Sequence, residues 1–113
     1  MAATAPVRRP SYEVADYEIW AETPELRMVV LTLGPGHEVP WHWHSNVSDT
    51  FFCMQGPMVI ETRAPRELVE LKPGDTYVVP AKRAHRVTGK DMGPCKFGIL
   101  QGVGTYDFNP VGG

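Results

Sequence analysis

Apolar residues in this chain come in short runs separated by polar and turn-forming residues. The clearest run is Leu26–Leu33, whose β-branched and aliphatic side chains are typical of a buried strand. Other strand-like runs occupy residues 12–20, 49–55, 58–63, 68–72, 76–79 and 96–103. Apolar stripes with helical spacing extend no further than about two turns. The pattern therefore predicts an all-β fold built from many short strands.

Glycine and proline separate these runs. The 11 glycines and 11 prolines lie mostly between the predicted strands, as hairpin turns require. Residues 58–63 and 68–72 are expected to form one hairpin around residues 64–67. No repeat or linker divides the chain, so residues 11–113 are expected to form a single domain. Residues 1–10 lack a periodic apolar pattern and are expected to be a flexible N-terminal segment.

Composition narrows the choice of partner. The chain has 113 residues, 42% of them apolar, and a formal net charge of -2 with charges of both signs spread along it. This gives no electrostatic footprint for nucleic acid or an anionic membrane, so a small-molecule partner is expected. No apolar run could span a bilayer and the N-terminus lacks the apolar core of a signal peptide, so we expect a cytoplasmic protein. In a reducing compartment Cys53 and Cys95 are expected to be free thiols.

Most candidate metal ligands lie within residues 36–56, and one more lies further along the chain. On a strand, His42 and His44 would lie on the same face, about 6 to 7 Å apart. Asp49 opens the next strand-like run, and His85 follows the run at residues 76–79. Three imidazoles and a carboxylate, with no thiolate, form a mixed N/O ligand set for a divalent transition metal such as Fe, Mn, Ni or Zn.

These residues resemble the two sequence motifs of the cupin family. The matching positions, with the family's spacing, are Gly36, His42, His44, Asp49 and Gly56 in the first motif and Gly74, Pro80 and His85 in the second. The resemblance implies a double-stranded β-helix, or jelly-roll barrel, with the metal held inside by His42, His44, the carboxylate position and His85.

Three positions depart from the motifs. Asp49 stands where the family has Glu, and one methylene less shortens its reach by about 1.5 Å against metal–oxygen bonds of about 2.0 to 2.2 Å. Asp49 could therefore ligate directly or through water. Lys82 replaces a Gly, which would reshape the loop before His85 if that turn needs a positive φ. Gly89 replaces an Asn and is expected to leave the metal unaffected.

Neighbouring residues have structural and functional interpretations. Phe51 and Cys53 share a face with Asp49 and are expected to be pocket walls. Trp41 and Trp43 face away from the histidines, which predicts interface or inter-sheet packing and a homodimer.

Three further polar residues lie near the motifs. Arg83 and Arg86 flank His85 and would either pair with an anionic substrate or form a solvated rim. His37 is expected to be a loop residue.

The sequence thus predicts a small metal-binding cupin that acts on a small oxygen-bearing organic molecule. The family resemblance admits dioxygenases, isomerases, lyases and decarboxylases. The metal should favour a substrate that brings negative charge through two oxygens, such as an enolised dicarbonyl or a hydroxy-carboxylate. Such a substrate could react with or without oxygen, and we prefer the oxygen-dependent branch. A non-catalytic binding or sensing module is the alternative.

Overall fold

Ten strands and one short 3-10 helix are seen in the computed structural model, which describes residues 10–111. Residues 1–9 of the predicted flexible segment lie outside this range. In chain order the elements are β1 (Asp16–Thr23), β2 (Leu26–Leu33), β3 (Glu38–Trp43), β4 (Ser48–Gln55), β5 (Met58–Thr62), β6 (Glu67–Leu71), β7 (Thr76–Val79), β8 (His85–Gly89), η1 (Lys90–Met92), β9 (Cys95–Gly102) and β10 (Asn109–Pro110).

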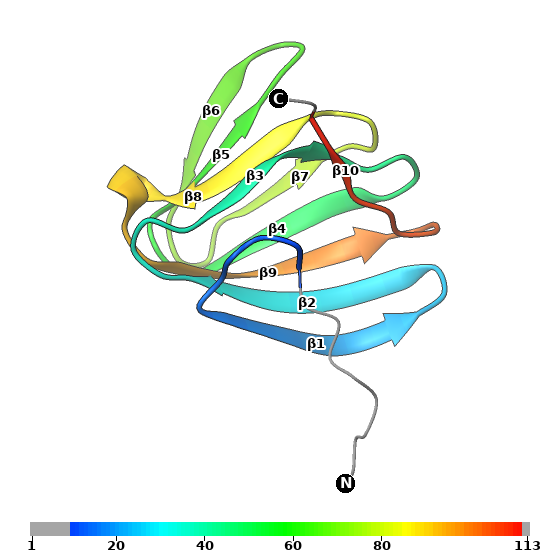
Figure 1. Cartoon of the computed structure of the whole chain (residues 1–113), viewed down its shortest axis with the longest axis horizontal. Helices are drawn as coiled ribbons and strands as arrows, with labels where there is room; N and C mark the ends of the chain where they lie inside the picture. The colour runs from blue at the N-terminus through cyan, green and yellow to red at the C-terminus, as the bar shows by residue number, and fades with distance from the viewer. Residues whose placement is uncertain (1–9, 112–113) are drawn as a thin grey trace, which may run out of the picture.

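The strands form two five-stranded sheets that face each other (Figure 1). One has the order β1-β2-β9-β4-β7 and the other β10-β3-β8-β5-β6. Every pairing between neighbours is antiparallel, and β9 lies between β2 and β4 although it is far from both in sequence. This arrangement confirms the predicted all-β, double-stranded β-helix.

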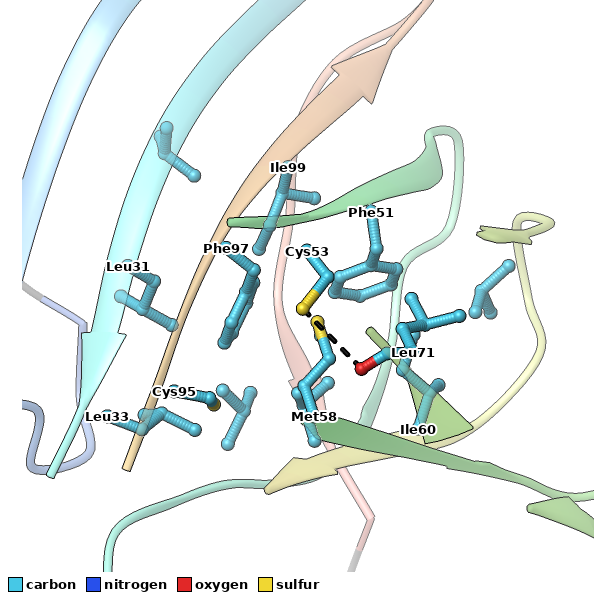
Figure 2. Close-up of a cluster of buried hydrophobic side chains, with 14 residues drawn as sticks. Leu31, Leu33, Phe51, Cys53, Met58, Ile60, Leu71, Cys95, Phe97 and Ile99 are labelled. Carbon is cyan, nitrogen blue, oxygen red and sulfur yellow. Dashed lines mark hydrogen bonds between the residues drawn. The ribbon is translucent and has the colours of Figure 1, made fainter. Parts of the chain in front are cut away.

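Alternation along the strands places the core between the sheets. On β2 the side chains of Val29, Leu31 and Leu33 are buried, and on β4 Phe51 and Cys53 are buried while their neighbours are half-buried. Figure 2 shows Cys53 in this apolar cluster, with its thiol directed at the carbonyl oxygen of Leu71. Because the side-chain period of a strand is two, Asp49 shares the inward face of Phe51.

Most predicted strands match observed ones within a few residues. The hairpin is confirmed, since β5 pairs with β6 from Met58 opposite Leu71 to Thr62 opposite Glu67. The strand expected at residues 12–20 begins later, at Asp16. Strand β3 ends at Trp43, so His44 lies just beyond it and not on it.

The loop before His85 keeps a left-handed turn in spite of its lysine. Lys82 has φ 73°, and its backbone N–H donates to the carbonyl of His44 over 2.7 Å. This bond connects the loop to His44. The left-handed turn is therefore retained although a positive φ is unfavourable for lysine. At Gly89 a side chain would meet the carbonyl oxygen of Gly93 at 1.9 Å. Glycine is therefore required there.

Trp41 and Trp43 are half-buried, not fully exposed. The Arg63 guanidinium covers the Trp41 ring at 4.1 Å from its centroid. Intrachain packing thus supplies part of the cover that a partner subunit was expected to provide, and the homodimer stays a prediction.

Two further expectations concern thiols and membranes. Cys53 and Cys95 are both buried and free. Across residues 10–111 the structure contains no helix long and apolar enough to cross a bilayer.

Candidate metal centre

Four buried polar side chains meet between the two sheets. His42 lies on β3 directly opposite His85 at the start of β8, while Asp49 reaches in from β4 on the other sheet. The four candidate ligand atoms of His42, His44, Asp49 and His85 all lie within 4.8 Å of one another. The fold therefore brings together all four residues that the sequence marked as ligands.

Each histidine is held by a backbone carbonyl behind it. A carbonyl oxygen can only accept, so each Nδ1 carries the hydrogen, and in the neutral ring Nε2 carries the lone pair. The distances from Nδ1 to the carbonyl oxygen are 2.7 Å for His42 to Pro40, 2.6 Å for His44 to Asp107 and 2.9 Å for His85 to Arg83. The three rings are thus fixed in the tautomer that presents Nε2 to a metal.

The Asp49 carboxylate completes the cluster. Its Oδ2 lies 3.0 Å from Nε2 of His44 and 2.9 Å from Nε2 of His85. Lone pairs on both sides repel, so these contacts need a proton or a metal ion between the atoms. Two ligand atoms at right angles around an ion with bonds of about 2.1 Å would lie about 3 Å apart. The donor set therefore fits a divalent metal, and the short side chain does reach the imidazoles.

Burial and mutual contact set the charges of the cluster. Burial, reinforced by the His85 imidazole, lowers the pKa of His42 to about 3. Burial alone would raise the pKa of Asp49, but hydrogen bonds with His44 and His85 outweigh it and hold this pKa well below its usual range. At neutral pH His42 is thus neutral and Asp49 ionised, which are the forms that bind metal.

His44 shows the opposite shift. Burial alone would lower its pKa, but the hydrogen bond and the charge of Asp49 outweigh burial and raise it. The carboxylate therefore favours the protonated form of His44, and a metal ion at Nε2 would compete with that proton.

Gln101 is a site residue that the sequence did not reveal. It lies on β9 directly opposite Asp49, and its Nε2 donates to Oδ1 of Asp49 over 3.1 Å. This bond leaves Oδ2 turned toward the histidines. A buried Gln inside an apolar strand was the available signal.

The segment after β9 covers the cluster with aromatic rings, which the sequence also did not indicate. Phe108 stacks on His42 with ring centroids 4.4 Å apart, and Tyr106 lies 5.3 Å from His44. Tyr12, from the segment before β1, stacks on Phe108 at 5.7 Å. These rings come from opposite ends of the described chain, so only the folded structure places them together.

Two neighbouring cavities share part of their walls, and the smaller one adjoins the cluster. One of about 20 Å³ touches His42, Asp49 and Phe51 directly. The other, of about 400 Å³, is lined by none of the four cluster residues and is large enough for a small organic molecule. Residues common to both walls are Tyr12, Ile99, Gln101, Tyr106 and Phe108.

Other residues singled out from the sequence lie elsewhere. Cys53 belongs to the apolar core, two residues beyond Phe51 on β4, and burial raises the pKa of its thiol. His37 accepts a hydrogen bond at Nδ1 from the backbone N–H of Gly34 over 2.9 Å, in the loop before β3. It takes no part in the metal cluster.

The two arginines beside His85 are engaged by this chain's own carboxylates. Arg83 bonds to Glu67 over 3.1 Å, and Arg86 bonds to Glu38 over 2.7 Å and to Glu61 over 2.5 Å. Neither lines the two cavities described above. These ion pairs are with this chain's own side chains, and the choice between a substrate contact and a solvated rim stays a prediction.

Comparison of the sequence with known protein families identifies one match. The family model of the cupin domain matches residues 29–106, which include all four cluster residues. A segment of 59 residues is 36% identical to quercetin 2,3-dioxygenase of Bacillus subtilis (strain 168). That match covers 51% of this chain and 17% of the dioxygenase, so the chain spans a small part of this relative.

Solved structures share the fold at low sequence identity. A protein with a double-stranded β-helix domain from Klebsiella pneumoniae aligns with a TM-score of 0.75 and 23% identity, over 93% of this chain and 90% of its own. A cupin superfamily protein from Desulfitobacterium hafniense DCB-2 aligns with a TM-score of 0.71 and 20% identity, over 86% and 84%. At this identity the likeness concerns the fold alone.

Proposed function

The chain belongs to the cupin family, and from this premise we propose that it is a metal-dependent enzyme that converts a small organic molecule bearing oxygen donors. The observation that carries the proposal is the set of three imidazoles, each held through Nδ1, whose Nε2 atoms converge with Oδ2 of Asp49. A purely structural cluster has no need to direct three Nε2 atoms at one point.

His42, His44, His85 and Asp49 would hold the metal. The ligand set contains nitrogen and oxygen but no sulfur, which favours Fe(II), Mn(II), Ni(II) or Zn(II). Such an ion, when bound, supplies a Lewis acid with positions left for substrate oxygens. We propose that Asp49 ligates directly, because its Oδ2 lies as close to the imidazoles as neighbouring ligands of one ion do.

The surrounding residues would bind the substrate and exclude water. Phe108 and Tyr106 cover the histidines, and Phe51 and Ile99 make the inner wall apolar. In such a dry site, charge interactions between the cluster and substrate oxygens are stronger than in water. A chelating anion, such as an enolised dicarbonyl or a hydroxy-carboxylate, matches a cationic centre of this kind.

The oxygen-dependent branch is our preferred reaction class. Its support is the segment related to quercetin 2,3-dioxygenase, which covers about half of this chain. Isomerase, lyase or decarboxylase activity would use the same kind of chelating substrate without oxygen. A non-catalytic binding module would bind such a molecule without converting it.

The experiment combines metal analysis with turnover. The purified protein is stripped with chelator, reloaded separately with Fe(II), Mn(II), Ni(II) or Zn(II), and assayed against diketones and hydroxy-carboxylates with and without air. We expect close to one metal per chain and turnover by the Fe(II) form in air. Turnover without oxygen would move the protein to the isomerase or lyase branch, and no turnover at full loading would favour the binding module.

His85→Ala and His37→Ala provide matched variants for this experiment. Both remove an imidazole, but only His85 belongs to the cluster. Loss of metal and activity from His85→Ala alone would support the site, while equal losses from both would show that the ligands are wrongly assigned.

A further inference from the structure

Arg27 is a buried cation on the wall of the larger cavity. Alternation along β2 places it on the inward face with Val29, Leu31 and Leu33, a position where the strand otherwise carries apolar side chains. Only 7% of its side chain is exposed. A guanidinium loses its hydration on burial, so this position is costly unless its donors find acceptors.

The partners of Arg27 leave part of its hydrogen-bonding capacity unused. One terminal nitrogen donates to the hydroxyl of Tyr17, and the guanidinium lies 3.9 Å above the Tyr106 ring. The Glu22 carboxylate is 3.6 Å from Nε, beyond hydrogen-bonding distance. Nε is therefore a buried donor without an acceptor among the described residues.

Arg27 belongs to a polar row that leads to the metal cluster. Gln101 on β9 lies directly opposite Arg27 on one side and Asp49 on the other. Its Nε2 bonds to Asp49, while its Oε1 is a second buried polar atom without a described partner. Neighbouring strands are about 4.8 Å apart, so the Arg27 and Asp49 backbones are separated by roughly 10 Å.

The larger cavity lies along this row. Arg27 and Gln101 both line it, and Gln101 also lines the smaller cavity beside Asp49. A ligand that extended from this cavity past Gln101 into the smaller one would face the metal cluster at one end and the guanidinium at the other.

We propose that Arg27 binds a carboxylate of the substrate at the end remote from the metal. The substrate class is then a short bifunctional acid, whose oxygen donors at one end meet the histidine cluster and whose carboxylate at the other accepts hydrogen bonds from Arg27. Gln101 lies between the two ends and lines both cavities. The metal-facing half of this assignment rests on the proposed function, whereas the Arg27 half does not.

Glu22 fits this role. It lies opposite Arg27 on the edge strand β1 and is partly exposed, so it offsets the guanidinium charge from the outer side. A substrate carboxylate would approach the guanidinium from the cavity side, where Arg27 forms part of the wall.

The test uses calorimetry with succinate, glutarate and the monomethyl ester of each as probes. Each ester keeps one carboxylate for the metal and lacks the charge for Arg27. For the wild-type protein we expect the esters to bind roughly 10- to 100-fold more weakly than the diacids, the effect of losing one charge-assisted hydrogen-bonding group. In Arg27→Met the difference between diacid and ester should vanish, and in Arg27→Lys it should be intermediate.

Arg66→Met is the matched control, since Arg66 has a side chain 79% exposed and lies outside the cavity. It should leave the preference for diacids unchanged. Metal content, measured in parallel, should be the same for all variants.

Three results would overturn the proposal. These are equal binding of diacid and ester by the wild type, an unchanged preference in Arg27→Met, and absence of diacid binding. Should Arg27→Met fail to fold, the wild-type comparison still decides. The titrations are repeated on chelator-treated protein, where a retained preference for diacids would support the Arg27 half independently of any metal. Failure of the stripped protein to take up metal again would refute the proposed function but not the role of Arg27.

Discussion

Gln101 donates a hydrogen bond from its side-chain amide to Oδ1 of Asp49 over 3.1 Å, in the buried centre of the barrel. The bond fixes the carboxylate so that its other oxygen points at two imidazoles. Groups that orient a metal ligand in this way typically affect metal affinity as well as geometry.

Replacing Gln101 by Leu should therefore weaken metal binding roughly 10- to 100-fold, the usual effect of removing a partner behind a ligand. Competition with a metal-sensitive dye would measure the affinity. Gln55→Leu, at the exposed end of β4, is the matched control and should bind metal as the wild type does. Equal affinity in Gln101→Leu would mean that Asp49 needs no support or is not a ligand.

The histidines allow a sharper test of the ligand set. His42→Ala and His85→Ala each remove an Nε2 from the cluster, so each should lower affinity by more than Gln101→Leu does. His37→Ala should not change it, because His37 lies in the loop before β3 and bonds to Gly34. Metal content after dialysis against limiting chelator would check this order.

The candidate ligands could be predicted from the sequence because the family's motif spacing marks His42, His44 and His85. Strand alternation accounts for His42 but not for His44, which lies beyond the end of β3. The all-β fold follows from the short apolar runs. Arg27 was visible in principle, since it occupies an inward position of the run Leu26–Leu33. Its place beside Gln101 could not be predicted, because that depends on how β2 pairs with β9.

The covering aromatic residues could not be predicted in the same way. Tyr12 and Phe108 are almost a hundred residues apart and meet through long-range packing. The ion-pair partners of Arg83 and Arg86 were hidden for the same reason, because their acceptors Glu67, Glu38 and Glu61 come from other strands. The role of a charged residue next to a motif histidine cannot be assigned until its ion-pair partners in the folded chain are known.

Lys82 offers a prediction about stability. Its φ of 73° lies in the left-handed region, which costs a non-glycine residue about 1 kcal/mol or more. Lys82→Gly should relieve that cost, offset by the greater freedom of glycine in the unfolded chain. We expect a net gain of up to about 1 kcal/mol in the free energy of unfolding, measured with urea. Lys82→Ala keeps the unfavourable φ and should give no such gain, so equal effects of both variants would contradict the explanation.

The pH dependence of the metal-free protein should depend on His42. Burial lowers its pKa to about 3 in the folded state, whereas an unfolded histidine titrates near pH 6.5. Below about pH 6.5 the unfolded chain therefore takes up a proton that the folded protein does not. The stability that neutral His42 provides is present above pH 6.5 and is lost by about 1.4 kcal/mol per pH unit as the pH falls toward 3.

Two other cluster residues act outside this window. The raised pKa of His44 gives stability that is complete below about pH 6.5 and is lost as the pH rises, while the lowered pKa of Asp49 gives stability that is lost only below about pH 4. Between pH 6.5 and 4 the contribution of His42 thus stands apart. His42→Phe, which keeps a ring to stack on Phe108, should flatten the decline in unfolding free energy over this range. Urea unfolding of chelator-treated protein at several pH values would measure it, and parallel slopes for both proteins would show that His42 is not kept neutral by the fold.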